Sequence, residues 1–127
     1  MFSKPEILTI ASSLSAHAMQ RQALIAENVA NADTPGYRAK DIPDFRESYL
    51  SASPFGMNHT REGHLATPGV PFTDAVGRQT AQMSPNGNSV SLETEMVKAA
   101  DTQREHNLAL AVYGKSLDIL RASLGRR

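Results

Sequence analysis

Residues 91–124 decide the fold; they read SLETEMVKAADTQREHNLALAVYGKSLDILRASL. Residues at alternating steps of four and three form one stripe along this stretch. Such spacing is typical of the a/d seam of helices that wrap around partner helices. The stripe consists of Leu92, Met96, Ala99, Gln103, His106, Leu110, Tyr113, Leu117, Leu120 and Leu124. The pattern therefore predicts a long helix whose stripe packs against other helices.

Local signals place both ends of this helix. Glu93 and Glu95 suit the positive end of a helix dipole, so we expect the helix to begin near Ser91. Gly125 ends it, because glycine readily leaves the helical conformation. The interior Gly114 weakens it by about 1 kcal/mol relative to alanine. The expected helix covers residues 91–124.

A second long helix is expected over residues 3–33. Ser3 and Glu6 have the spacing of a capping box, and Pro5 is tolerated in a first turn. Pro35 and Gly36 end the helix, since proline disfavours helical geometry at the residue before it. The apolar stripe between these signals consists of Ile7, Ile10, Ala11, Leu14, Ala18, Ile25, Val29 and Ala32.

The middle of the chain, residues 34–90, holds all but one of the seven prolines and most of the glycines. This composition predicts an irregular segment. A short helix is expected around residues 44–51, with brief strands near 63–67 and 78–83. Five of the seven aromatic residues also lie here, which argues against permanent disorder. The fold expected is all-α: two long terminal helices form an antiparallel, coiled-coil-like pair, joined by a Pro/Gly-rich, mostly irregular middle with possible short strands.

Composition excludes several classes of function. Lys and Arg balance Asp and Glu at 13 each, so no strong field attracts nucleic acid or an anionic membrane. Cysteine is absent, which excludes disulfides and thiolate-bound metals. No apolar run approaches the length of a membrane span, and the first residues do not resemble a cleaved signal peptide. Composition alone is typical of a soluble cytoplasmic protein.

Candidate chemistry is weak. The four histidines lack the spacing of a metal site, and no nucleophile elbow or phosphate-binding loop is present. Glu93 and Glu95 face opposite sides of the expected helix, so they do not form an acid/base pair. We therefore expect no enzyme activity, no cofactor and no metal.

The apolar residues exceed what one pair of helices can bury. Leu8, Met19 and Leu24 lie off the first stripe, and residues such as Val97 and Leu108 lie off the second. These residues would face water in a lone molecule, so we expect several chains to pack together. Gln103 and His106 lie within the second stripe, where they either fix the register of packing or mark a solvated edge.

The most specific motif is residues 27–39, ENVANADTPGYRA. A helix stop explains Pro35 and Gly36, but not two asparagines three apart or the following tyrosine. The sequence here resembles the signature of the flagellar basal-body rod and hook family, Asn-x-Ala-Asn-x-x-Thr-Pro-Gly-Tyr. The matching residues are Asn28, Ala30, Asn31, Thr34, Pro35, Gly36 and Tyr37. Residues 86–96 also resemble the start of that family's last helix.

The resemblance implies a structural subunit of the proximal rod that transmits torque from motor to hook. It implies a rod core made of helices 3–33 and 91–124, which are joined by the irregular middle segment 34–90. The residues expected to pack between helices are Ile25, Val29, Leu92, Met96, Leu110, Tyr113, Leu117, Leu120 and Leu124.

The same resemblance implies partners and a location. The implied partners are rod subunits of the FlgC, FlgF and FlgG types, the rod-base protein FliE, and the flagellar type III export apparatus. The implied location is the periplasm-spanning rod, reached without a cleaved signal peptide, in place of the cytoplasm. Two alternatives remain: a neighbouring rod subunit of the same family, and a soluble helical adaptor or export chaperone.

Overall fold

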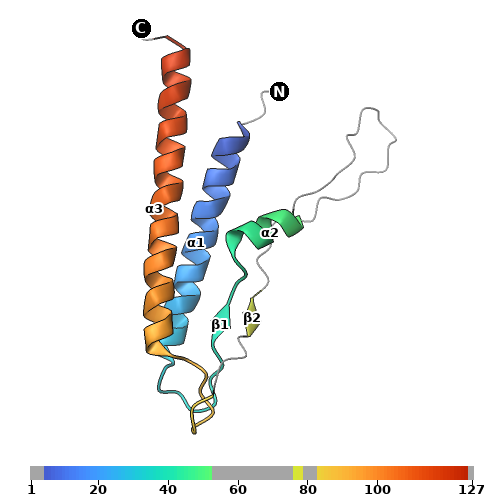
Figure 1. The fold of residues 1–127 in the computed structure, drawn as a ribbon, viewed down its shortest axis with the longest axis vertical. Coiled ribbons are helices and arrows are strands. Elements are labelled where there is room, and N and C mark those ends of the chain that lie inside the picture. Colours follow the sequence, from blue (N-terminus) through green and yellow to red (C-terminus); the bar gives the residue numbers. More distant parts are fainter. Residues whose placement is uncertain (1–4, 53–75, 79–82, 126–127) are drawn as a thin grey trace, which may run out of the picture. The chain divides into compact units, whose positions relative to one another are not determined.

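The computed structural model describes residues 5–52, 76–78 and 83–125. Its elements in chain order are α1 (Glu6–Ala30), β1 (Lys40–Asp41), α2 (Phe45–Ala52), β2 (Gly77–Arg78) and α3 (Leu92–Ser123). They divide into two compact units, one of Met1–Asp41 with Arg78–Arg127 and one of Ile42–Gly77. The terminal helices belong to the first unit (Figure 1). The expected all-α fold with an irregular, strand-containing middle is confirmed.

Helix α1 begins directly after Pro5. The Pro5 carbonyl accepts hydrogen bonds from the backbone N–H groups of Leu8 and Thr9, at 3.0 and 3.3 Å. Pro5 itself occupies the cap position, where it makes no side-chain cap bond. The capping box expected from Ser3 involves a residue outside the described part of the chain. At the other end the helix stops at Ala30, before the expected residue 33, because Asn31 leaves the helical conformation.

Helix α3 has 32 residues and a length of about 48 Å. The hydroxyl of Ser91 accepts from the backbone N–H of Thr94 at 3.5 Å, which caps the first turn. After Leu124 the chain leaves the helix at Gly125, where φ is 81°. The ends expected from the sequence are therefore correct to within one residue. No helix in the described residues is long and apolar enough to cross a membrane.

Helices α1 and α3 lie side by side and run in opposite directions (Figure 1). The residues buried on α3 follow one another at steps of seven: Glu95, Thr102, Ala109 and Ser116. Those buried on α1 are Ala11, His17, Ala18, Ile25 and Asn28. The contact between the helices is therefore made largely by small and polar side chains, which let the two backbones approach closely.

Most of the apolar stripe predicted on α3 is turned away from α1. Leu92, Met96, Leu110 and Leu124 are 47–86% exposed, and Tyr113 and Leu120 are exposed to 40% and 37%. Ala99, His106 and Leu117 of the stripe are half-buried. On α1, Ile25 is buried but Val29 is exposed. The buried residues of α3 each come one position before a residue of the predicted stripe, namely Met96, Gln103, Leu110 and Leu117. One position corresponds to a rotation of about 100° around the helix axis, which separates these two sets of residues.

The second unit contributes α2, which matches the short helix expected over 44–51 to within one residue. The rings of Phe45 and Tyr49 stack along it, with centroids 5.6 Å apart. The strand expected near 63–67 lies outside the described residues. Of the strand expected near 78–83, the structure shows the two-residue β2, which pairs with β1. Strand β1 was not predicted, because two residues carry no periodic signal.

Candidate functional site

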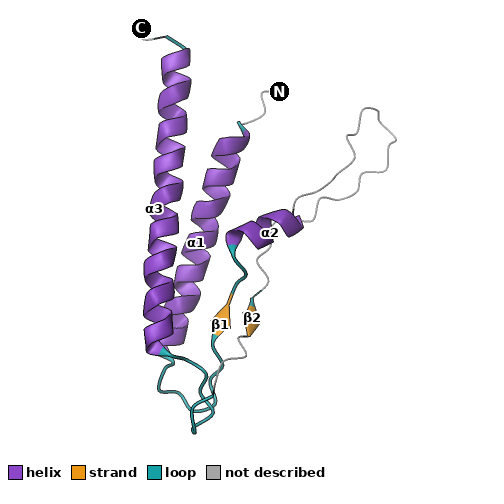
Figure 2. Ribbon diagram, in the orientation of Figure 1, coloured by secondary structure: helices purple, strands orange, loops and turns teal. Residues whose placement is uncertain are grey.

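The sequence motif lies at the junction where α1 ends and α3 begins (Figure 2). Two turns meet there, one at Gly36 and one at Gly87, with φ of 73° and 79°. Gly36 donates its backbone N–H to the Asn86 carbonyl at 3.0 Å, and Ser89 donates its backbone N–H to the Tyr37 carbonyl at 3.1 Å. A Cβ on Gly87 would lie 3.5 Å from the Gly36 Cα. Residues more than 50 positions apart in sequence are thus bound together.

Asn28 is the centre of this junction and is fully buried. Its side-chain amide pairs with the backbone of Lys40 in both directions: Nδ2 donates to the Lys40 carbonyl at 2.8 Å, and Oδ1 accepts from the Lys40 N–H at 3.0 Å. Nδ2 also donates to Glu95 Oε2 at 3.0 Å, and Oδ1 accepts from the Tyr37 hydroxyl at 3.3 Å. All four hydrogen-bonding positions of the amide are filled. Asn28 therefore joins α1, β1 and α3.

Asn88 forms a second link at this junction. Its Nδ2 donates to the carbonyls of Asn31, Ala32 and Thr34, at 3.0, 2.6 and 2.9 Å, where α1 has just ended. Its Oδ1 accepts from the Val90 N–H at 2.7 Å. These three carbonyls lie past Ala30, in the turn that follows α1. A residue that precedes α3 therefore holds the turn that follows α1.

A network of charges extends from Asn28 across the helix pair. Asp41 accepts from Arg21 of α1 at 3.2 Å and pairs with Lys98 of α3 at 3.0 Å. Lys98 also pairs with Glu95 at 3.1 Å. These side chains are at most 16% exposed, so the pairs are little screened by water. Buried pairs of this kind depend strongly on geometry, because each charge has lost its hydration.

Tyr37, the last residue of the motif, is half-buried beside this network. Burial raises the pKa of its phenol above the ordinary value of 10.0, and the negative charge of Glu27 raises it further. Glu27 itself is paired with Lys40. The phenol therefore stays protonated at neutral pH and donates to Asn28.

The motif residues predicted from the sequence meet at this junction. Asn28 is buried, Asn31 and Tyr37 are half-buried, and Ala30, Thr34, Pro35 and Gly36 are exposed. Asn31 Nδ2 donates to the Glu27 carbonyl at 2.8 Å and Asn31 Oδ1 accepts from Thr34 Oγ1 at 3.2 Å, so the second asparagine closes the last turn of α1.

The sequence did not indicate that four residues meet at the junction: Arg21, Asp41, Asn88 and Lys98. From the sequence, Glu95 is expected to suit the helix N-terminus and to pair with Lys98 on an exposed face. The pair is present, but Glu95 is 2% exposed and also bonded to Asn28. The signal available in the sequence was the resemblance of residues 86–96 to the same family. The sequence does not show that these residues meet the first motif, which is far away along the chain.

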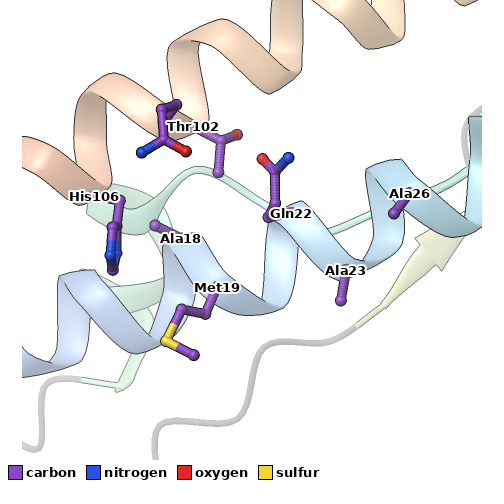
Figure 3. Close-up of a pocket in the computed structure, with 8 residues that line it drawn as sticks. Ala18, Met19, Gln22, Ala23, Ala26, Thr102 and His106 are labelled. Atoms are coloured by element: carbon purple, nitrogen blue, oxygen red, sulfur yellow. The ribbon is translucent and has the colours of Figure 1, made fainter.

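A groove of about 400 Å³ opens between α1 and α3 beyond the junction. Figure 3 shows residues of both helices along it: Ala18, Met19, Ala23 and Ala26 from α1, with Thr102 and His106 from α3. His106 Nδ1 lies 3.2 Å from the Ser15 hydroxyl, so it bridges the two helices, whereas Gln103 is exposed and bonds to Asn107. The described residues contain no cluster of side chains able to hold a metal ion.

Comparison with known proteins identifies the class of this chain. Residues 7–38, which span most of α1 and the motif, match the family described as "Flagella basal body rod protein". The flagellar basal body rod protein FlgB of Salmonella typhimurium is 34% identical over 108 residues, covering 77% of this chain and 78% of that protein. FlgB of Agrobacterium fabrum is 31% identical, with 81% of each chain covered, and FlgB of Escherichia coli is 31% identical, with 72% and 73% covered.

The chain therefore belongs to the flagellar basal-body rod protein family. It is a non-enzymatic, structural subunit of the rod of the flagellar basal body, and the relatives it matches within the family are FlgB proteins. Membership in this family means assembly with other flagellar components.

Proposed function

We propose that the chain enters the proximal rod by packing the outward faces of its terminal helices against helices of neighbouring subunits, and that it transmits torque through these contacts. The main support for this proposal is the exposed apolar surface of α3. It comprises Leu92, Met96, Val97, Leu108, Leu110, Tyr113, Ile119, Leu120 and Leu124, each at least 37% exposed.

These residues lie on more than one side of α3. Leu92, Met96 and Leu110 flank one edge of the contact with α1, and Val97, Leu108 and Ile119 flank the other. A subunit with two different adhesive edges forms head-to-tail contacts that propagate into a helical assembly instead of closing as a dimer.

The helix pair suits a load-bearing part. Long helices packed along their length resist bending more than a segment joined by loops. Asp41 links the two helices, because it pairs with Arg21 of α1 and with Lys98 of α3. We propose that residues 3–33 and 91–124 form the rod core and that residues 34–90 form a separate middle segment. Within the core, the helix-packing residues are those named from the sequence: Ile25 against α3 and Val29 with the exposed residues of α3 against neighbours.

The proposed neighbours are rod subunits of the FlgC, FlgF and FlgG types and the rod-base protein FliE, and the proposed route is the flagellar type III export apparatus. Family membership supports these partners. Site-specific crosslinking in purified basal bodies would identify which neighbours contact α3.

The function is tested with Leu110→Asp in the full chain. Leu110 is 54% exposed, so a charge there leaves the helix pair intact but places an uncompensated charge in the proposed interface. We expect the variant to be exported and to fail in rod assembly and motility. The matched control is Asn107→Asp, an exposed polar position on the same helix. Normal motility of the Leu110→Asp strain would contradict the proposal.

A further inference from the structure

Helix α3 could present a more apolar face to α1 than the one it uses. The residues in contact are Glu95, Thr102, Ala109 and Ser116, and the residues that directly follow them are Met96, Gln103, Leu110 and Leu117. A rotation of α3 by one residue, about 100°, would exchange the two sets. Hydrophobic burial alone favours the second set, because two leucines and a methionine would leave water.

The face in use also carries a defect. Thr102 is 1% exposed, and its hydroxyl has no hydrogen-bond partner among the described residues. A buried hydroxyl without a partner is unfavourable. The contact at Thr102 therefore does not explain why α3 holds this rotation.

We infer that the polar cluster of Asn28, Asp41, Glu95 and Lys98 selects the rotation of α3 and so keeps its apolar stripe turned away from α1. Rotating α3 by one residue would carry Glu95 away from Asn28 and Lys98 away from Asp41. Asn28 Nδ2 would lose its 3.0 Å bond to Glu95, and the 3.0 Å ion pair of Lys98 with Asp41 would break. Asn28 is fully buried, so one N–H of its amide would lose its acceptor and keep no access to water. Asp41 would lose the positive charge that α3 supplies and keep only that of Arg21 among its printed ion pairs.

A polar contact inside a helix pair commonly fixes register at the expense of stability. Here the contact fixes rotation, and the surface it preserves comprises Met96, Leu110 and Leu117. The inference about the rotation of α3 does not depend on the proposed function. The role of the exposed stripe does depend on it, because this is the stripe that we propose meets neighbouring subunits.

The absence of cysteine from the chain makes a direct test available. A single cysteine is introduced by Ala109→Cys or by Leu110→Cys in the full chain at low concentration, and its rate of reaction with a maleimide is measured. Ala109 is 1% exposed and Leu110 is 54% exposed. We expect the Leu110→Cys chain to react at least tenfold faster than the Ala109→Cys chain. A ratio near one in this background would overturn the inference.

The same ratio is then measured after removal of the cluster with Asn28→Ala, Glu95→Ala and Lys98→Met. We expect the ratio to fall below one, because Leu110 now turns toward α1. The matched control is Asp101→Ala with Arg104→Met, which removes an exposed ion pair of 3.0 Å from the same helix and leaves the ratio unchanged. Glu95→Gln as a single substitution keeps an acceptor for Asn28, and we expect it to leave the ratio of the unaltered chain unchanged.

Two results from the triple variant would also overturn the inference. One is an unchanged ratio in the triple variant with its helix content retained, which would show that close packing of Ala11, Ala18 and Ala109 sets the rotation. The other is a ratio near one with loss of helix content by circular dichroism, which would show that the cluster holds the helices together without choosing between two pairings. Glu95→Ala alone, which removes only part of the cluster, must also lower the ratio.

Discussion

Asn28 of α1 donates its side-chain amide to the carboxylate of Glu95 on α3, over 3.0 Å and out of reach of water. The two residues are 67 positions apart in sequence. Their bond ties the end of the first helix to the start of the last, which is where the signature of the rod family lies. The motif is thus a device for joining two helix ends, and its asparagines act through hydrogen bonds to backbone and carboxylate.

Replacement of Glu95 by alanine is expected to lower the free energy of unfolding by about 3 kcal/mol, because it leaves the Asn28 amide without one acceptor and disturbs the Lys98 charge. Chemical denaturation followed by circular dichroism measures the change. The control is Glu93→Ala, an exposed carboxylate in the same helical turn, with an expected change within about 0.5 kcal/mol. Equal effects of the two substitutions would refute the assigned role of Glu95.

Replacement of Asn88 by alanine is expected to cost about 2 kcal/mol, because three carbonyls in the turn directly after α1 lose their donor. Hydrogen exchange should quicken at the end of α1, around residues 28–34, although the substitution lies more than 50 positions away. Asn107→Ala, at an exposed position on α3, is the control. Unchanged exchange at the end of α1 would show that Asn88 does not cap it.

Two glycines should respond in opposite directions to alanine. Gly36 has φ of 73°, so Gly36→Ala is expected to destabilise the fold by about 1 kcal/mol through backbone strain. Gly114 is helical, and a Cβ there would meet nothing within 4 Å, so Gly114→Ala is expected to stabilise by about 1 kcal/mol. Thermal unfolding of both variants measures the difference. A shift of the same sign in both would be inconsistent with the turn described at Gly36.

Stability should decline at alkaline pH in a way that depends on Tyr37. Its raised pKa means that the folded chain holds the phenol proton more tightly than the unfolded chain does. The resulting stabilisation is complete below pH 10 and is lost as the pH rises through the folded pKa. In Tyr37→Phe, the slope of unfolding free energy against pH above pH 10 should be shallower, and an identical slope would contradict the assignment.

The sequence predicted the helices well because their signals are local. Ser91 and Gly125 mark the ends of α3. Pro35 with Gly36 placed the end of the first helix near residue 33, three residues after its actual end at Ala30. The family motif was likewise legible as a run of residues. The face by which each helix contacts the other could not be predicted in this way. Leu110 and Ala109 are neighbours that differ in burial, and the reason for the difference lies outside α3.

That reason lies in contacts between distant segments. Asp41 holds Arg21 of one helix and Lys98 of the other, and no spacing within the sequence relates these three residues. The hydrophobic pattern located an apolar stripe on α3 but did not show that most of this stripe points away from α1. A polar junction can overrule the apolar pattern because unpaired buried charges are more costly than exposed leucines.

The most direct test of this account is a map of purified basal bodies in which side chains are visible. We predict that Met96 and Leu110 lie buried against a helix of a neighbouring subunit, while Thr102 and Ala109 remain against α1 of their own chain. A map in which the Met96 and Leu110 stripe packs on its own α1, or faces open solvent inside the finished rod, would contradict it.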